Sequence, residues 1–399
     1  MKIGAGMTNP PTLVIPVKTG IQKIFIFRGV LVGHSCLDIG DWNLFGYWNL
    51  VIGDWSFIVM DLLIFDMDGV LIDVSGSYRK TIAQSIHIYF KECLGIKSKT
   101  ISNEEISLFK AAGGFNNDWD LTSGFLLYLL SVSGLPPCPK RRRFADVKEA
   151  TSFLKRKSSE FTPPAIKPPQ KNHLSHFLTK VKGQGGGLKG VRLALKNSWD
   201  GWVYGSGDLE RKNLVKRIFQ EVYLGEKFAS HYHLPRLFFG GEGLYLQERL
   251  LIPRRILSSL LKKMRLGIAS GRPRFEAELA LKRFRIFPYF DSVVTLDECE
   301  KEEARLLAVS EKKVKLTKPH PYSLLKAIEQ IGIPNPLCGY IGDVVDDMRA
   351  AQAAKKYFSM LAIGFLRSGK TEPVMMEALV RAGADCIIKN PKELLQFAG

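Results

Sequence analysis

The stretch Leu62–Leu71, which reads LLIFDMDGVL, constrains the fold more than any other part of the chain. Its first four apolar residues predict a short buried strand that ends at Asp66, and a second carboxylate, Asp68, follows two residues later. Gly69 then allows a sharp turn. Because ligands in an open α/β sheet bind just beyond the carboxyl ends of the strands, two acids at this place indicate a chemical role. The alternative is that both are turn and N-cap residues, as Asp often is.

Three later segments favour the chemical role, and two of them are further apolar runs. Leu266–Arg272, LGIASGR, starts with apolar residues and ends in the hydroxyl of Ser270. Leu337–Asp347, LCGYIGDVVDD, is also apolar at its start, and its run ends at Asp343. Both runs therefore predict strands that finish in a polar group, as the first strand does.

A lysine in the remaining segment completes this pattern. Lys318 precedes Pro319, and the following sequence, HPYSLLKAIEQIG, has the apolar spacing of a helix. Proline suits the first turn of a helix, so Lys318 is expected at the mouth of that helix. If the three strands are parallel, their carboxyl ends meet at one edge of the sheet, with the lysine on a neighbouring loop.

The assembled site would hold Asp66, Asp68, Ser270, Lys318 and Asp343, a set that suits phosphoryl transfer. Asp66 would attack phosphorus to form an aspartyl-phosphate, while Asp68 would protonate the leaving oxygen and later activate water. Ser270 would bind phosphate oxygens, and Lys318 would offset the repulsion between the nucleophile and the phosphate. Asp343 and Asp66 would hold Mg²⁺, a hard ion that prefers carboxylate oxygen and water.

These segments resemble the four motifs of the haloacid dehalogenase superfamily of phosphohydrolases. The sequence DMDGVL, which starts at Asp66, matches the DxDGx(L/T) signature. Ser270 matches the Ser/Thr of the second motif, Lys318 the lysine of the third, and Asp343 with Asp347 the GDxxxD of the fourth. The resemblance runs from about residue 60 to the C-terminus. It implies a Rossmann-like three-layer α/β core with a mainly parallel sheet and the first aspartate as nucleophile.

The resemblance also implies a Mg²⁺ cofactor, with Asp66, Asp68, Asp343 and Asp347 as the expected ligands. Asp346 is an additional acid beside the expected one, so the sequence leaves open whether Asp346 or Asp347 supports the metal. Asp68 favours a phosphatase or a phosphomutase, since dehalogenases of this superfamily lack the acid/base aspartate at that position.

Nearly two hundred residues separate the first two motifs, where the resembled family carries an inserted, mostly helical cap domain. We therefore expect residues 60–77 and 250–399 to form the catalytic core and residues 78–249 to form the cap. Apolar spacing predicts helices over Tyr78–Leu94, Asn103–Ala112, Ser123–Val132, Lys212–Leu224 and Leu244–Lys263. The sequences GGFNNDWDLT and FQEVYLGEKF also resemble a capped subfamily described as phosphoglycolate-phosphatase-like.

Substrate contacts are expected from both domains. In the core, Gly271 and Arg272 follow the second motif, and Arg272 would grip a phosphate or carboxylate with its planar fork. In the cap, Asn116 and Asn117 lie in the candidate specificity loop Gly113–Trp119. The alternatives are a structural acid as the partner of Arg272 and an ordinary helix–helix connection capped by Asn and Asp.

The net charge of +18 is concentrated in one part of the expected cap. Residues 138–190 contain thirteen Lys and Arg against three Asp and Glu, together with Pro- and Gly-rich sequence. This composition predicts a long flexible insertion. Such a segment could bind nucleic acid or an acidic partner. A solvated loop is the preferred interpretation, because no aromatic residues alternate with the basic run.

Residues 1–59 fit no part of the expected core. They contain the repeat GDWN, GYWN and GDWS, and Met60 stands just before the first strand. We hypothesise that the natural enzyme starts at Met60 and that the preceding residues are a misread extension. The rival interpretation is a Trp-rich interaction arm.

The chain has no sequence mark of a membrane or secreted protein. No apolar run reaches the roughly 18 residues needed to span a membrane, and no secretory signal is recognisable. The six cysteines form no CxxC pair or Cys/His cluster, which predicts reduced thiols in the cytoplasm. The sequence thus predicts a Mg²⁺-dependent phosphatase acting on a small phosphorylated metabolite. The alternatives are a phosphomutase and a regulatory protein that binds nucleic acid through the basic insertion.

Overall fold

The computed structural model describes residues 59–398, apart from gaps at 99–100, 116, 141, 162–170, 312 and 368–371, and two short strands near the N-terminus. Those strands, β1 (Ile24–Phe27) and β2 (Val30–Gly33), pair antiparallel. The Trp repeats of residues 39–57 lie outside the described residues, and the two hypotheses about residues 1–59 stay predictions.

The core is a six-stranded sheet in the order β10-β9-β8-β3-β6-β7, and every neighbouring pair in it is parallel. Its strands are β3 (Leu62–Phe65), β6 (Arg265–Ala269), β7 (Ser292–Val294), β8 (Cys338–Gly342), β9 (Met360–Phe365) and β10 (Cys386–Ile388). The three strands expected from the sequence are β3, β6 and β8, and β3 lies between the other two. The predicted α/β class with a mainly parallel sheet is confirmed.

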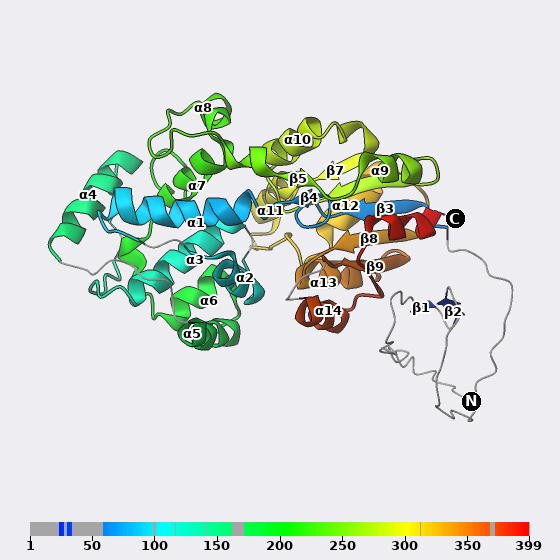
Figure 1. Ribbon diagram of the computed structural model, residues 1–399, viewed down its shortest axis with the longest axis horizontal. Helices are drawn as coiled ribbons and strands as arrows, with labels where there is room; N and C mark the ends of the chain where they lie inside the picture. Colours follow the sequence, from blue (N-terminus) through cyan, green and yellow to red (C-terminus); the bar gives the residue numbers. More distant parts are fainter. Residues whose placement is uncertain are drawn as a thin grey trace.

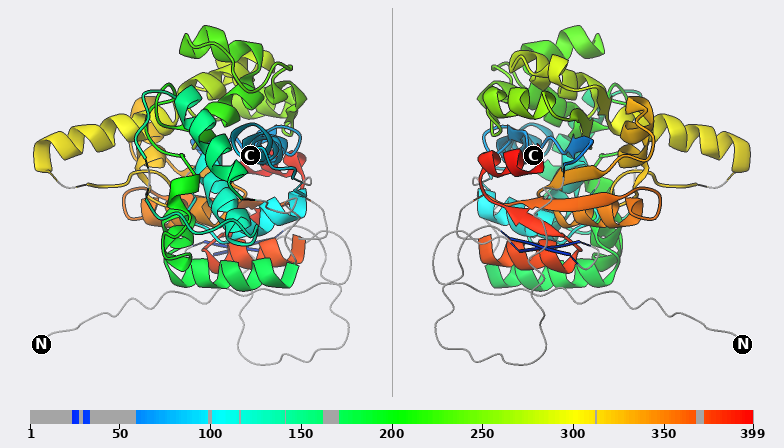
Figure 2. Two further views of the ribbon diagram at one scale, coloured as in Figure 1. Left: turned by 90° about the vertical axis from the view of Figure 1, so that its left-hand side faces the viewer. Right: turned by 90° about the vertical axis from the view of Figure 1, so that its right-hand side faces the viewer.

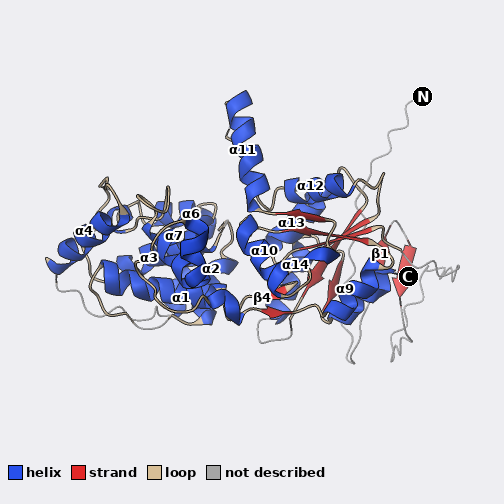
Figure 3. Ribbon diagram, turned by 90° about the horizontal axis from the view of Figure 1, so that it is seen from above, coloured by secondary structure: helices blue, strands red, loops and turns tan. Residues whose placement is uncertain are grey.

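Helices cover both faces of this sheet (Figure 3). The helices of the core are α9 (Arg254–Leu261), α10 (Arg274–Arg283), α11 (Leu296–Ser310), α12 (Tyr322–Ile331), α13 (Val345–Ala354) and α14 (Glu372–Arg381), followed by a 3₁₀ segment at Pro391–Ala398. Alternate residues of β3 serve different layers: Leu62 and Ile64 pack with α12 and α13, whereas Leu63 and Phe65 join the cluster on the opposite face. This arrangement gives three layers. Helix α11 projects away from the rest of the core (Figure 2).

The inserted segment folds into a helical cap beside the core (Figure 1). Its helices are α1 (Tyr78–Ile88), which continues into a π-helical turn at Tyr89–Cys93, α2 (Asn103–Ala111), α3 (Asp118–Ser131), α4 (Val147–Ser159), α5 (Lys171–Gly183), α6 (Gly187–Ala194), α7 (Leu214–Leu224) and α8 (Glu226–Tyr232). Helices α1, α2, α3 and α7 correspond to four of the predicted helices.

The prediction of one continuous helix over Leu244–Lys263 is wrong. The chain there forms a 3₁₀ turn at Leu244–Gln247, the short strand β5 (Arg249–Leu250) and then α9. Pro253 directly precedes α9. Proline has no N–H to donate and disfavours helical backbone in the residue before it, so a helix can begin at Pro253 but cannot run through it.

The expectation of a flexible insertion over residues 138–190 is also wrong for most of that segment. Helices α4 and α5 form there, and their apolar residues recur at helical spacing and are buried, among them Leu154, Leu174 and Val181. Asp146 caps α4 by accepting the N–H groups of residues 148 and 149. The many lysines of this segment made the helical spacing of its apolar residues hard to recognise in the sequence. The Pro-rich residues 162–170 lie outside the described residues.

Two short strands connect the cap to the core. Strand β4 (Ile72–Asp73) leads toward α1, β5 returns from the cap, and the two pair antiparallel. The predicted domain boundaries at residues 77–78 and 249–250 fall within or beside this connection. Among the described residues, no helix is both long enough and apolar enough to cross a membrane.

Candidate active site

The ends of β3, β6 and β8 bring their polar residues to one edge of the sheet. Asp66 follows β3, donates its backbone N–H to the carbonyl of Ile341 at 2.9 Å, and is only 6% exposed. Ser270 follows β6 and is buried, and Asp343 follows β8. Because β6 and β8 both pair with β3, the three residues converge as the strand pattern predicts.

Lys318 lies at the centre of this edge. Its Nζ donates to Oδ1 of Asp66 and to Oδ1 of Asp347, both at 2.6 Å, and to the Tyr340 hydroxyl at 2.9 Å. Burial lowers the pKa of Lys318, but the negative charges of Asp347 and Asp66 outweigh that effect and hold the pKa well above its ordinary value. The ammonium group is therefore charged at neutral pH.

The acids at this edge exceed the positive charge available to them. Oxygens of Asp66, Asp343 and Asp347 lie within 4.8 Å of one another. Burial raises the pKa of Asp66 to about 7; Lys318 opposes this rise, and Asp347 and Asp68 add to it. Burial, followed by the charges of Asp347 and Asp66, raises the pKa of Asp343 well above its usual range. A hard divalent cation fits such a set, because it binds carboxylate oxygens and offsets their repulsion.

Asp347 is the member of this cluster whose oxygens are already engaged by the protein. Its Oδ1 accepts from Lys318 and from the Tyr340 hydroxyl, at 2.6 and 2.9 Å, and its Oδ2 accepts the N–H groups of Asp343 and Val344, both at 3.2 Å. Asp346 instead lies 3.7 Å from Arg349 and is partly exposed. Of the two acids that the sequence left open, Asp347 is the one beside Asp66 and Asp343.

Gly69 and Gly342 make room for these carboxylates. Gly69 has a φ of +85°, and a Cβ there would come within 1.9 Å of Oδ2 of Asp343. A Cβ at Gly342 would lie 2.2 Å from the Cβ of Asp347. Any side chain at either position would displace an acid of the cluster, so both glycines are required for the arrangement of Asp343 and Asp347.

Asp68 is not one of the three acids of the cluster, although the sequence interpretation made it a metal ligand. Its Oδ1 accepts a hydrogen bond from Nε of Arg272 at 2.6 Å and lies 2.6 Å from Nη2 of the same guanidinium. Arg272 also pairs with Glu248 at 3.0 Å, and its side chain is 1% exposed. The described partners of this guanidinium are therefore protein groups, which corresponds to the alternative of a structural acid. Gly271 is exposed, and a Cβ added there would meet open space.

The two asparagines expected to contact substrate are placed differently. Asn116 lies outside the described residues. Asn117 caps α3: its Oδ1 accepts the N–H of Asp120 at 2.7 Å. This matches the alternative of a helix–helix connection. The preceding loop is held against the start of α6, where the N–H of Gly187 donates to the carbonyl of Gly113 at 2.8 Å.

A cap lysine that the sequence interpretation missed lies close enough to the core acids for their charges to affect its pKa. Helix α2, which contains Lys110, lies on the side of the cap toward the core (Figures 1 and 3), and the Nζ of Lys110 lies 3.5 Å from Oδ1 of Asp118. Asp118 raises the pKa of Lys110, and Asp68 and Asp343 of the core act in the same direction. Lys110 lies in the last turn of a helix that ends just before Gly113, and this position could have indicated a functional lysine. The sequence around it is that of an ordinary exposed helix surface, so Lys110 was not predicted.

Part of the core and a shorter stretch of sequence are similar to known proteins. Residues 254–355 match the family model of the haloacid dehalogenase-like hydrolases, a segment that contains Ser270, Lys318, Asp343 and Asp347 but not Asp66. A stretch of 74 residues is 39% identical to phosphoglycolate phosphatase of Xylella fastidiosa strain 9a5c, and it covers 18% of this chain and 29% of that protein. The chain thus matches less than a third of the length of this curated relative.

Solved structures resemble the chain over a larger share of its length. An X-ray structure from the Northeast Structural Genomics Consortium is 19% identical, covers 84% of this chain and 97% of its own, and has a TM-score of 0.51. The phosphatase Tt82 from Thermococcus thioreducens is 22% identical, covers 80% and 99%, and has a TM-score of 0.45. The first likeness supports the fold.

Proposed function

We propose that the chain is a Mg²⁺-dependent phosphatase of a small phosphorylated metabolite, since residues 254–355 match the family model of the haloacid dehalogenase-like hydrolases. One observation carries the proposal. The carboxylate of Asp66, at the end of the central strand, is held 2.6 Å from the ammonium group of Lys318 and next to Asp343. A buried carboxylate beside a fixed cation suits attack on phosphorus, where two negatively charged groups must approach each other.

In the first step, an oxygen of Asp66 bonds to phosphorus while the bond from phosphorus to the leaving oxygen breaks. Asp68 supplies the proton that this oxygen needs to leave as an alcohol, so the step ends with an aspartyl-phosphate and ionised Asp68. Lys318 offsets the negative charge that Asp66 and the phosphoryl group bring together. Its hydrogen bonds to Asp347 and Tyr340 fix the position of that charge before substrate arrives.

In the second step, Asp68 takes a proton from water as the water oxygen bonds to phosphorus. The bond to Asp66 breaks, inorganic phosphate leaves, and both aspartates return to their starting states. The buried hydroxyl of Ser270 is placed at the same edge of the sheet to bind a phosphate oxygen.

Asp66 and Asp343 are the residues that would hold Mg²⁺, since both oxygens of Asp347 already accept hydrogen bonds from the protein. When bound, the ion would neutralise charge on the phosphoryl oxygens and on the two carboxylates. We assign Asp347 to orienting Lys318 and the backbone of the loop after β8.

The substrate is proposed to carry a second anionic group. Lys110 is a cap cation whose charge interacts with the core acids Asp68 and Asp343, so it would meet the part of the substrate that extends from the phosphate. The curated relatives in Xylella fastidiosa are named phosphoglycolate phosphatase, which makes a small phosphorylated carboxylate the first substrate class to try. We also propose a cytoplasmic location, in agreement with the free thiols of Cys93, Cys299 and Cys338.

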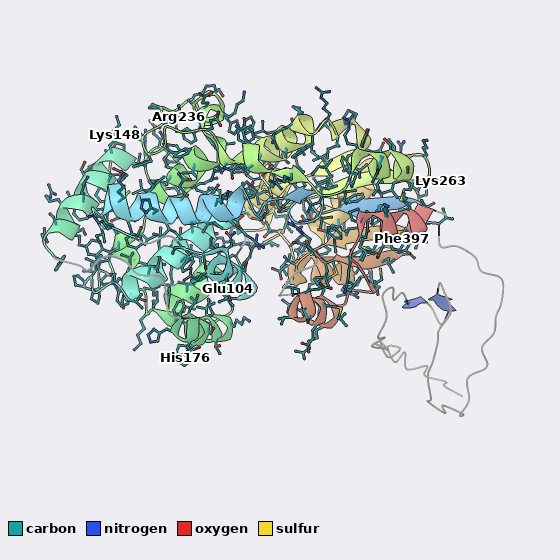
Figure 4. All side chains as sticks on the ribbon, in the orientation of Figure 1. Glu104, Lys148, His176, Arg236, Lys263 and Phe397 are labelled. Atoms are coloured by element: carbon teal, nitrogen blue, oxygen red, sulfur yellow. The ribbon has the colours of Figure 1, made fainter. Side chains whose placement is uncertain are left out.

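The basic segment of the cap does not favour nucleic acid as a partner. Lys148 of α4 and His176 of α5 lie on opposite sides of the cap (Figure 4), so the two labelled positions do not share one face. A binding surface for a phosphate backbone needs its cations along one track.

A phosphate-release screen over small phosphorylated metabolites, with Mg²⁺ and with a chelator, tests the proposal. We expect metal-dependent release that Asp66→Asn abolishes and that Asp346→Asn, an acid outside the cluster, leaves in place. Conversion of a sugar phosphate without release of phosphate would instead identify a phosphomutase. Equal turnover by Asp66→Asn would refute the assignment of the nucleophile.

A further inference from the structure

Arg272 is a fully buried arginine whose described hydrogen bonds go to protein acids and a tyrosine. Nε donates to Oδ1 of Asp68 at 2.6 Å, and Nη2 lies 2.6 Å from the same oxygen as an ion pair. Nη2 donates to Oε1 of Glu248 at 3.0 Å, and Nη1 donates to the Tyr223 hydroxyl at 3.2 Å. The guanidinium carbon lies 5.0 Å from the centre of the Tyr78 ring. With four groups around it, the planar fork of the guanidinium has one orientation.

The groups that fix Arg272 belong to the connection between cap and core. Glu248 immediately precedes β5, and its Oε1 also accepts from the hydroxyls of Ser77 at 3.1 Å and Tyr223 at 3.0 Å. Ser77 immediately precedes α1 on the other connection, and Tyr223 lies on α7 of the cap. Arg272 therefore ties Asp68 to both chain crossings between the domains.

Asp68 is held at one oxygen. Nε of Arg272 donates to Oδ1 and Nη2 lies 2.6 Å from that same oxygen, and among the described residues no group donates a hydrogen bond to Oδ2. The side chain of Asp68 is 27% exposed, whereas those of Arg272 and Glu248 are 1% exposed. The carboxylate thus has one anchored oxygen on the buried side and one oxygen that remains available.

We infer that Arg272 is a positioning residue for Asp68: it anchors Oδ1, so that Oδ2 is the oxygen that exchanges a proton with the leaving group and with water. This inference rests on the proposed function, in which Asp68 is the general acid and base. It replaces the expectation that Arg272 binds substrate, because the fork is already engaged by Asp68 and Glu248. It also differs from a purely structural role, because the anchored partner is the proton donor itself.

Leaving-group dependence separates these three roles. Phenyl phosphate and p-nitrophenyl phosphate have similar size, but phenoxide is the more basic leaving group and needs the proton more. If Arg272 positions the acid, Arg272→Lys should lower kcat for phenyl phosphate at least about ten-fold more than for p-nitrophenyl phosphate, as part of the about 10²–10⁴-fold that positioned proton transfer contributes. Asp68→Asn should show the same selectivity, more strongly.

Each other outcome overturns the inference. An equal fall for both esters would indicate a structural role, and a rise in KM with kcat unchanged would indicate substrate binding. Arg274→Lys is the matched control, since Arg274 lies two residues further on and pairs with Glu298. It should leave the ratio of the two rates unchanged.

A milder variant covers the case in which Arg272→Lys fails to fold. Tyr223→Phe removes one partner of Arg272 and of Glu248 but keeps every charge, and a ratio unchanged in this variant would then overturn the inference. The proposed function fails separately: it fails if the unmodified chain releases phosphate from neither ester nor any metabolite. If the unmodified chain is active, Asp66→Asn is inactive and the ratio does not move, the positioning role alone is refuted.

Discussion

Lys318 and Arg272 occupy two similar clusters to which we assign different functions. Each cation lies between two carboxylates and a tyrosine hydroxyl: Lys318 between Asp66 and Asp347, and Arg272 between Asp68 and Glu248. Around Arg272, a planar fork engages several groups at once and fixes them. Around Lys318, a compact point charge balances a nucleophile.

The two clusters also differ in charge balance. Asp343 adds a third acid to the cluster of Lys318, which leaves that edge of the sheet with an excess of negative charge and with raised pKa values at Asp66 and Asp343. Asp68 and Glu248 share Arg272 without a third acid in direct ion-pair contact among the described residues. The excess of acid around Lys318 indicates a site that can bind a metal cation and a phosphate. The guanidinium of Arg272 is already paired with acids on both sides, which indicates that it holds other residues in position.

Removing the cation of the first cluster should have the largest effect. Lys318→Met keeps an unbranched side chain one atom shorter than lysine and leaves Asp66 and Asp347 without their partner, so kcat should fall by about 10³-fold. Steady-state turnover of the best substrate measures this. Lys326→Met, at a lysine on α12 that pairs with Glu329, is the control. Similar kcat values for the two variants would mean that the two clusters do not differ in the way described.

Glu276 tests the second cluster through pH. Burial raises its pKa to about 7, against the hydrogen bonds from Tyr78 and Gln220 and the charge of Arg272. The folded chain then binds more protons than the unfolded chain between about pH 4.5 and 7, so stability is lost as pH rises through this window. Glu276→Gln should remove that loss, on the order of 3 kcal/mol in the free energy of unfolding.

Urea unfolding of the Glu276→Gln variant and the unmodified chain between pH 5 and pH 8 measures this difference. The gap between the two curves should widen toward pH 8 in favour of the variant. Glu278→Gln, at a more exposed position on the same helix, is the control and should follow the unmodified chain. Parallel curves for Glu276→Gln would show that Glu276 stays ionised in the folded state.

Gly69→Ala tests whether activity and the use of Mg²⁺ depend on the position of Asp343 in the first cluster. The added Cβ would meet Oδ2 of Asp343 and would sit at a φ of +85°, so the acid must move. We expect kcat to fall about 10²-fold and the Mg²⁺ concentration for half-maximal activity to rise about 10–100-fold. Gly240→Ala, where a Cβ meets open space, is the control. An unchanged Mg²⁺ requirement would argue against Asp343 as a ligand.

Lys110→Ala should have the smallest effect. It tests the contribution of the cap to substrate binding separately from that of the two core clusters. The loss of one partly exposed cation should raise KM about ten-fold for a phosphorylated carboxylate and change KM little for p-nitrophenyl phosphate, which lacks the second anion. Initial rates at varied substrate concentration give both values. Lys91→Ala, at an exposed lysine paired with Glu92, is the control. Equal changes in KM for both substrates would remove Lys110 from recognition of the second anion.

The sequence predicted the first cluster better than the second for a physical reason. Asp66, Ser270 and Asp343 each end an apolar run, and the parallel rule alone brings such ends together. The second cluster joins Arg272 to Asp68, 204 residues apart, and to Glu248 on the return from the cap. No local pattern marks those contacts, because they depend on how the two chain crossings pack.

The prediction was wrong where a Lys- and Pro-rich composition made the helical spacing of apolar residues hard to recognise. Lysines and prolines suggested a flexible segment over residues 138–190, yet α4 and α5 bury apolar residues spaced by three and four. The opposite error occurred at Pro253, where apolar periodicity was extended across a residue that starts a helix. Each error arose because only one of two signals, apolar periodicity or the Pro-, Gly- and Lys-rich composition, was weighed.

The position of the cap within the chain has a consequence for biosynthesis. Strand β3 pairs on one side with β6, whose partner residues lie roughly two hundred positions later, and on the other side with β8, which follows later still. At about 5–20 residues per second, the central strand therefore waits on the order of 10–40 s on the ribosome with both edges open. The cap is completed during that interval, so a nascent chain that stalls before residue 265 exposes an unpaired apolar strand beside a finished helical domain.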